Sequence, residues 1–306
     1  MPAGSVVPGC DGSCPSDGPV AWTRDCDNLI QANPSDVRGA DGAAVADTPY
    51  AFTDGRAYDR FIGRWSESVA PVFLNWLMID GGRRWLDVGC GTGAFTRLIA
   101  ETAQPASLVA IDPSEEQIRH ARARLFDKPV ELRVADAQAL PFSDASFDVV
   151  ASALVINFIP DRPKALSEMR RVARSGGLVA GYVWDFAGGR APGSPVVRAL
   201  RELGHGPASP PGAGDTRLDA LIDMFRRAGL GDVAAREIPV SLAYPDFEDL
   251  WTSLTPGYTA TTKLLHGLAA SEQDRVREIV QRQLVTLPDG RVSFSSVANA
   301  VSGRVS

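Results

Sequence analysis

The chain has 306 residues, of which 44% are hydrophobic and 22% charged, as in an ordinary globular protein. Its formal net charge is −6, and residues 1–50 carry most of that charge with seven Asp and two Arg. The rest is nearly neutral and shows no basic patch, which disfavours DNA or RNA as a substrate. We find neither a run of about 18 apolar residues that could span a membrane nor a secretory signal, and we therefore expect a cytoplasmic protein.

The first 50 residues are rich in Gly, Pro, Ser, Asp and Ala and contain few large apolar side chains. Such a segment cannot bury enough surface to offset its chain entropy, so we expect a disordered acidic tail before one domain over 51–306. Its three cysteines have the spacing C-x3-C-x11-C with no histidine nearby: Cys10, Cys14 and Cys26. Zinc sites need a fourth ligand and a tighter first pair, so no metal site is predicted.

Between residues 55 and 77 large apolar side chains recur at helical spacing. Pro71 lies within this pattern, and proline suits the first turn of a helix but breaks an interior. The segment is therefore predicted to form two helices divided at Pro71.

A short buried strand at 85–88 leads into a glycine-rich turn, and the apolar positions Phe95, Leu98 and Ile99 then indicate one face of a helix. Glycines without a Cβ and the positive end of a helix allow a ligand to approach backbone N–H groups. By itself this turn predicts only that a nucleotide-like ligand can bind here.

A second strand, 108–111, ends in Asp112 about twenty residues after the turn. This is the spacing at which a carboxylate meets a ribose diol in doubly wound folds. The next helix is predicted to begin at Ser114, with Gln117 completing a capping box. Further strands at 130–134 and 147–151 alternate with helices, which favours a parallel α/β sheet.

The second half continues this alternation, with an irregular insert. We predict a helix over 161–175, a strand over 178–184, and a Gly- and Pro-rich segment, 186–217, around a short helix at 195–203. An insert after a central strand lies where ligands bind in open α/β sheets, so it is predicted to be a lid and substrate wall. The last expected elements are a helix ending at Gly229, a strand over 233–243 that Pro239 bends or places at an edge, helices at 246–254 and 271–286, and a strand at 291–295.

Three motifs together resemble the class I S-adenosylmethionine-dependent methyltransferases: LDVGCGTG (86–93), AIDPS (110–114) and ADAQALPFSDASFDVV (135–150). The resemblance is strongest to the small-molecule branch of ubiquinone/menaquinone-biosynthesis type, methyltransferase type 11. It implies a Rossmann-like, seven-stranded, mostly parallel sheet with an antiparallel last strand and a helical lid insert. It also implies S-adenosyl-L-methionine as cofactor, a cofactor-binding core over 84–184, helices over the cofactor at 55–80 and the rest of the sheet in 218–306. The acceptor would be a small molecule, with no nucleic acid or membrane partner; the oligomeric state stays open.

The same resemblance implies roles for individual residues. The turn would face the methionine portion of the cofactor through Gly89, Cys90, Gly91 and Gly93, with Asp87 holding the ammonium through the turn. Asp112 would bind the ribose hydroxyls, Pro113 and Ser114 would flank the adenine, and Asp136 with Ala137 would bind its amino group. The sulfonium would be lined by Ala153 and Leu154, and the carboxylate would be reached by Tyr58 and Arg64.

Two other functions fit parts of the pattern. Gly89-x-Gly91-x-x-Ala94 satisfies a permissive dinucleotide fingerprint, as in an NAD(P)-dependent oxidoreductase. Asp87, the additional Gly93 and the lack of a Tyr-x-x-x-Lys pair argue against it. A non-catalytic protein that binds S-adenosylmethionine is the other alternative. No catalytic residue is assigned: the histidine nearest the expected substrate cavity, His205, is interpreted as a solvated loop residue.

Overall fold

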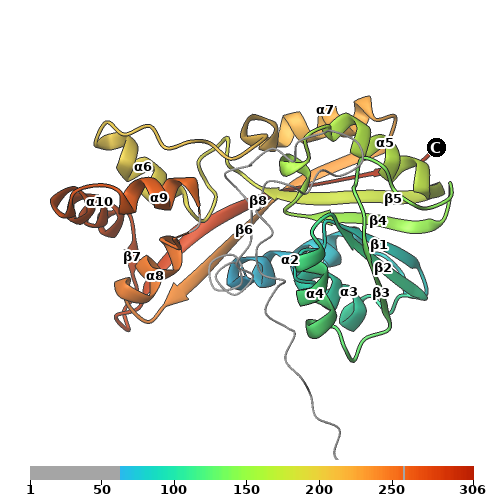
Figure 1. Cartoon of the computed structure of the whole chain (residues 1–306), viewed down its shortest axis with the longest axis horizontal. Helices are drawn as coiled ribbons and strands as arrows, with labels where there is room; N and C mark the ends of the chain where they lie inside the picture. The colour runs from blue at the N-terminus through green and yellow to red at the C-terminus, as the bar shows by residue number, and fades with distance from the viewer. Residues whose placement is uncertain (1–62, 258) are drawn as a thin grey trace, which may run out of the picture. The chain divides into compact units, whose positions relative to one another are not determined.

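The computed structural model describes residues 63–257 and 259–306. The expectations for the tail, its cysteines and Tyr58 lie outside the described residues. One mixed sheet runs through the described part of the chain in the order β3-β2-β1-β4-β5-β8-β6, and the short β7 pairs with β8 (Figure 1). The strands are β1 Arg84–Val88, β2 Ser107–Asp112, β3 Val130–Val134, β4 Phe147–Ala153, β5 Ala173–Trp184, β6 Gly231–Tyr244, β7 Val285–Thr286 and β8 Val292–Arg304.

Strands β1 to β5 pair in parallel, whereas β8 is antiparallel to both β5 and β6. The expected Rossmann-like sheet with an antiparallel last strand is therefore confirmed. Along this chain β1 leads outward to β2 and β3, and the chain then returns to place β4 on the other side of β1. Ligands of open α/β sheets bind at such a reversal, beyond the carboxyl ends of the strands.

Helices cover both faces of the parallel part of the sheet (Figure 1). Two helices, α5 Arg162–Val172 and α7 Leu218–Arg227, pack on one face with a core that includes Leu86, Val109 and Phe225. The other face carries α2 Arg64–Leu77 and α3 Ala94–Thr102, around Trp65 and Phe73. The alternation of neighbouring residues such as Trp85 and Leu86 between the two cores follows from the period of a strand.

A second group of helices lies around the far ends of β6 and β8 (Figure 1). It consists of α6 Ser194–Glu202, α8 Phe247–Leu254, α9 Ala260–His266 and α10 Ala270–Arg282, and α6 contacts both α9 and α10. A further helix of the described residues, α4 Glu115–Arg124, packs beside β2 and β3. None of the described helices is both long and apolar enough to cross a membrane.

The predicted break at Pro71 is wrong, because α2 continues through this residue. Trp65, Val69, Phe73 and Leu77 recur every fourth position and are all buried, so packing holds the helix on both sides of the proline. Pro71 itself is exposed, where the carbonyl that loses its hydrogen bond can meet water.

Several other boundaries differ from the sequence prediction. The helix expected at 271–286 ends at Arg282, and Val285–Thr286 form β7 because they pair with β8. Helix α5 ends at Val172 rather than 175, because Ala173 is extended, pairs with Phe147 and begins β5. Strand β8 runs over Val292–Arg304 rather than 291–295. Helix α9 was not predicted, and β6 is longer than expected but does place Pro239 on an edge strand.

Candidate functional site

The backbone of the glycine turn after β1 has conformations that are unfavourable for residues with a side chain. Gly89, Gly91 and Gly93 have φ of 76°, 53° and 83°, in the left-handed region that favours glycine. A Cβ on Gly89 would lie 2.5 Å from Cγ1 of Val155. The amides of Gly89 and Cys90 both donate to the carbonyl oxygen of Ile111, each at 2.8 Å, so the turn is fixed to the end of β2.

Asp112, at the end of β2, connects this turn to the start of α4. Its Oδ2 accepts a hydrogen bond from the Gly91 amide and its Oδ1 accepts one from the Ser114 amide, both at 2.9 Å. Burial raises the pKa of Asp112, and the two backbone hydrogen bonds offset part of that rise. The Ser114 hydroxyl in turn accepts from the amide of Gln117, which confirms the predicted N-cap of α4.

Asp87 lies beneath the turn and is completely buried. One carboxylate oxygen accepts a 2.6 Å hydrogen bond from the Thr96 hydroxyl, and the other has no hydrogen-bond partner among the described residues. Burial, with a smaller contribution from the charge of Asp112, raises the pKa of Asp87 to about 7. A buried carboxylate oxygen without a donor is costly, and a cationic group nearby would relieve that cost.

A cavity of about 300 Å³, which we call the turn cavity, opens beside these residues at the carboxyl ends of β1, β2 and β4. Of the residues predicted to bind the cofactor, it is lined by Gly89, Cys90, Gly91, Asp112, Ser114, Ala153 and Leu154. Burial raises the pKa of the Cys90 thiol well above its ordinary value, so this group stays protonated.

Other predicted residues are not in the lining of the turn cavity. Asp87 and Gly93 are not in its lining, Pro113 and Asp136 are exposed, and Ala137 belongs to the core on the α5 face. The carboxylate of Asp136 accepts hydrogen bonds from the backbone and side chain of Gln138. Arg64 forms an ion pair with Asp249 at 3.3 Å and lies 4.6 Å from the centre of the Tyr244 ring.

The turn cavity also has lining residues that sequence reasoning missed. They are Gly63, Ser66, Thr92, Ala94, Phe95, Glu116, Gln117, Val155, Phe158 and Tyr182. Glu116 lies in the first turn of α4, where a negative charge is favourable to the helix dipole, and its sequence position alone does not indicate that it lines a cavity. A usable signal existed for Tyr182, a large side chain with a polar hydroxyl within the otherwise apolar segment 178–184 of β5.

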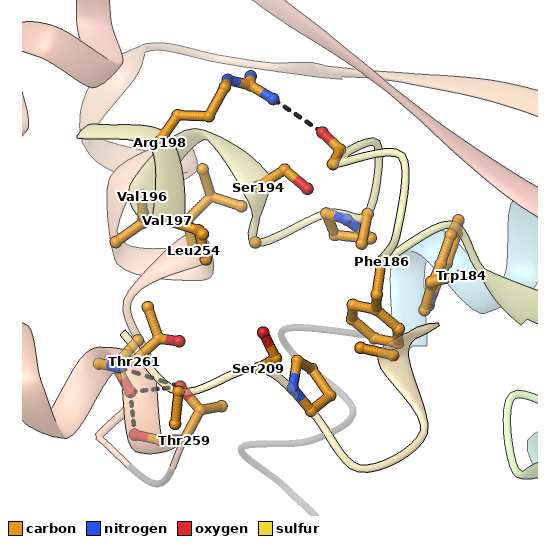
Figure 2. A pocket seen from close by; sticks show the side chains of 18 of the residues that line it. Trp184, Phe186, Ser194, Val196, Val197, Arg198, Ser209, Leu254, Thr259 and Thr261 are labelled. Atoms are coloured by element: carbon orange, nitrogen blue, oxygen red, sulfur yellow. Dashed lines mark hydrogen bonds between the residues drawn. The ribbon is translucent and has the colours of Figure 1, made fainter. Parts of the chain in front are cut away.

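A second, mostly apolar cavity of about 160 Å³ lies between the 186–217 insert and helices α8 and α9; we call it the insert cavity (Figure 2). Leu154 and Phe158 line both cavities, so the two adjoin there. Leu154 has φ of 62°, which is unusual for a residue with a side chain, and its amide donates to the Tyr182 carbonyl at 2.7 Å.

Comparison with known proteins gives matches centred on this region. A family described as "Methyltransferase domain" matches residues 86–181. The phosphatidylethanolamine N-methyltransferase of Cereibacter sphaeroides is 35% identical over 147 residues, which cover 47% of this chain and 70% of that protein. The 27-O-demethylrifamycin SV methyltransferase of Amycolatopsis mediterranei is 34% identical over 168 residues, 53% of this chain and 59% of that protein. The chain spans less than half of the length of several other curated relatives that it matches, between 36% and 44%.

Solved structures with low sequence identity share the fold. The Bacillus subtilis YcgJ protein superimposes with a TM-score of 0.52 at 17% identity, covering 78% of this chain and 98% of that one. A phosphoethanolamine N-methyltransferase 2 of Haemonchus contortus, solved with S-adenosyl-L-methionine, gives 0.52 at 19% identity, covering 84% and 58%.

Proposed function

The chain belongs to the class I S-adenosylmethionine-dependent methyltransferases, whose cofactor is S-adenosylmethionine, and we propose that it transfers the cofactor's methyl group to a small-molecule acceptor. The observation that carries this proposal is the pair of adjoining cavities. The turn cavity has the features of a nucleotide site, and the insert cavity is an apolar chamber that meets it at Leu154 and Phe158. A methyl group that moves from the turn cavity to the insert cavity would therefore pass only the wall that these two residues form.

The residues of the turn cavity fit the cofactor. The glycine turn leaves open space where a Cβ on Gly91 would project, so a ligand can approach the backbone there. Asp112 would accept hydrogen bonds from the ribose hydroxyls, which is supported by its position in the cavity lining and by the two amides that hold its carboxylate. Asp87, with one oxygen lacking a donor, would attract the cofactor's ammonium through the turn.

The cofactor supplies an electrophilic methyl group on a sulfonium. The acceptor atom forms a bond to the methyl carbon while the carbon–sulfur bond breaks and its electron pair stays on sulfur, giving S-adenosylhomocysteine. The protein contributes by holding the acceptor in line and keeping water away. Leu154 and Phe158 provide an apolar wall for this purpose, and we propose that the 186–217 insert acts as the lid.

A titration with three ligands tests this proposal. Calorimetry with S-adenosylmethionine, S-adenosylhomocysteine and NAD should show saturable binding of the first two and none of NAD. Asp112→Ala should weaken binding of both about 10- to 100-fold, the equivalent of losing charge-assisted hydrogen bonds. Glu115→Ala is the matched control, an exposed carboxylate outside the turn cavity, and should bind like the wild type.

Thermal unfolding of each variant separates lost contacts from lost structure, because Asp112 also holds the turn. Binding of NAD alone, or equal losses in both variants, would contradict the proposal. Tight cofactor binding with no turnover of any acceptor would instead favour a non-catalytic protein.

A further inference from the structure

The insert cavity combines an apolar lining with a few hydroxyl groups, and none of its described lining residues is an ordinary general base. Most of its lining is apolar, and hydroxyl groups of Ser194, Ser209 and Thr261 face it (Figure 2). Among the described residues of this lining there is no Asp, Glu, His, Lys, Cys or Tyr. His205, the histidine of the insert, is not in the lining and lies with its Nε2 3.3 Å from Glu272.

Two arginines of α6 are the charged residues of the described lining, Arg198 and Arg201. The guanidinium of Arg198 donates from Nε to Gln283 at 3.0 Å and from Nη1 to the carbonyl oxygen of Gly189 at 2.8 Å. Both partners are neutral, and Figure 2 shows the second of these bonds at the rim of the cavity. The side chain is thus held in place while three of its five N–H donors remain for another group.

The positive charges of Arg198 and Arg201 are not neutralised by an ion pair with a described residue. Neither Arg198 nor Arg201 forms an ion pair with any residue that the structure describes, although they are three positions apart on one helix. Both arginines are exposed residues, so like charges at this spacing on the helix repel each other modestly. Partial burial lowers the pKa of Arg198, as expected for a cation that lacks a nearby anion. An anionic ligand group would remove this repulsion and use the remaining donors.

We propose that the insert cavity binds an apolar organic anion as the methyl acceptor, with its carboxylate or ionised hydroxyl held by Arg198 and Arg201 and its apolar body against the cavity wall. This inference rests on the proposed methyltransferase function and names its substrate class. The same charges oppose cationic amines, because no described lining residue offers a carboxylate to an ammonium group.

The chemistry of transfer agrees with this assignment. With no general base among the described lining residues, the acceptor atom must already be nucleophilic when it binds. An ionised phenol, enol or carboxylate meets that requirement, and nearby arginines favour the ionised form of such groups. The hydroxyls of Ser194 and Thr261 can orient further oxygen atoms of the acceptor.

The test compares three probes that share one apolar body: 2-naphthoate, 2-naphthamide and 2-naphthylmethylammonium. Their binding to the full-length protein is measured by calorimetry, with and without saturating S-adenosylhomocysteine. We expect 2-naphthoate to bind at least 10-fold more tightly than the other two. Replacing both arginines, R198Q with R201Q, should remove this preference and leave binding of 2-naphthamide unchanged. The charge-preserving pair R198K with R201K should restore most of it.

Arg217→Gln is the matched control, an exposed arginine outside the cavity, and should keep the preference of the wild type. The inference is overturned if the three probes bind equally, if the amine binds best, if none binds, or if the double Gln variant still prefers the anion. S-adenosylhomocysteine binding is read separately in every variant. A protein that fails to bind it but prefers 2-naphthoate would refute the proposed function and support the anion site.

Discussion

Two carboxylates at the ends of adjacent strands, Asp87 and Asp112, share one turn but experience different surroundings. Asp112 has both oxygens occupied by backbone amides, so its geometry is fixed before any ligand arrives. Asp87 is more deeply buried and has one donor, the hydroxyl of Thr96. Asp112 is therefore suited to precise hydrogen bonding, and Asp87 to responding to a positive charge near the turn.

The raised pKa of Asp87 predicts how stability depends on pH. In the unfolded chain its pKa is near 3.8, and in the folded protein it is about 7, so the folded state binds the proton more tightly. The stability from this proton is complete below pH 4 and is lost as the pH rises through 7. Between pH 5 and pH 8 the free energy of unfolding of the wild type should fall by about 3 kcal/mol more than that of Asp87→Asn.

Urea unfolding of the cofactor-free protein at both pH values measures this difference. Asp136→Asn, an exposed strand-end carboxylate, serves as control and should follow the wild type. Parallel pH profiles for wild type and Asp87→Asn would show that Asp87 is ionised throughout this range.

Among individual residues, the sequence predicted those whose positions are set by the strand–turn–helix motif. The glycines and Asp112 could be placed because spacing along a strand–turn–helix unit fixes where they meet. Tyr182 and Phe158 reach the turn cavity from strand β5 and from the residues after β4, far away in the sequence. Their contribution depends on how elements pack, which no local pattern records.

Among the elements, the start of the 186–217 insert is fastened to the sheet by one ion-pair cluster. Asp185, at the end of β5, is 2% exposed and accepts hydrogen bonds from the Gly188 amide and from Nε of Arg190, the latter at 2.5 Å. Arg190 also pairs with both carboxylate oxygens of Glu237 on β6. The insert is thus anchored to an inner strand and to the edge strand together.

Removing this anchor should cost stability. Arg190→Ala leaves the buried Asp185 carboxylate with one donor fewer, and we expect a loss of about 1 to 3 kcal/mol in the free energy of unfolding. The loss should be nearer the lower value, because the arginine side chain is 42% exposed and water can replace part of its interaction with Asp185. Urea unfolding measures it.

The matched control is Arg217→Ala, which breaks an exposed pair with Asp219. Its effect should stay within about 0.5 kcal/mol. Similar losses in the two variants would mean that the cluster at Asp185 contributes no more than an ordinary surface pair.

Element boundaries were harder to predict wherever packing overrides local preference. Strand β8 contains Ser, Asn, Ala and Gly, which are poor or neutral strand formers, yet it extends over thirteen residues because β5 and β6 pair with it on either side. Its Asn299 is buried and donates to the Thr216 carbonyl at 2.8 Å, a contact that only the folded chain creates. Pro71 is the converse case: proline usually breaks a helix, yet α2 continues through it because the buried face of the helix packs on both sides.

For the molecule as a whole, β8 joins the two halves of the sheet. It separates β5 from the edge strand β6, and its buried Ala298, Ala300 and Val301 complete both cores. A chain that ends at Gly290 would expose the edges of both neighbours and the apolar surface that β8 covers. We expect this truncated chain to lose cooperative unfolding in urea and to aggregate.

A chain that ends at Val305 is the control, because it lacks only the exposed Ser306 and should unfold like the full chain. A cooperative transition at the wild-type midpoint for the shorter chain would refute a central role for β8. The mostly parallel sheet with an antiparallel last strand was predicted from the family resemblance, and helices near α6, α8 and α10 were predicted too, whereas α9 was missed because it is short and contains two β-branched threonines.

The wall shared by the two cavities has a consequence for how the protein can evolve. Side chains that touch only the insert cavity, such as Val197 or Thr261, can be exchanged to suit a new acceptor without disturbing the cofactor. Leu154 and Phe158 line both cavities, so under the proposed function a substitution there would alter the cofactor site and the acceptor site together. The proposed function thus implies that substrate preference can change through the residues of the insert cavity alone, and that the two residues common to both cavities limit such changes.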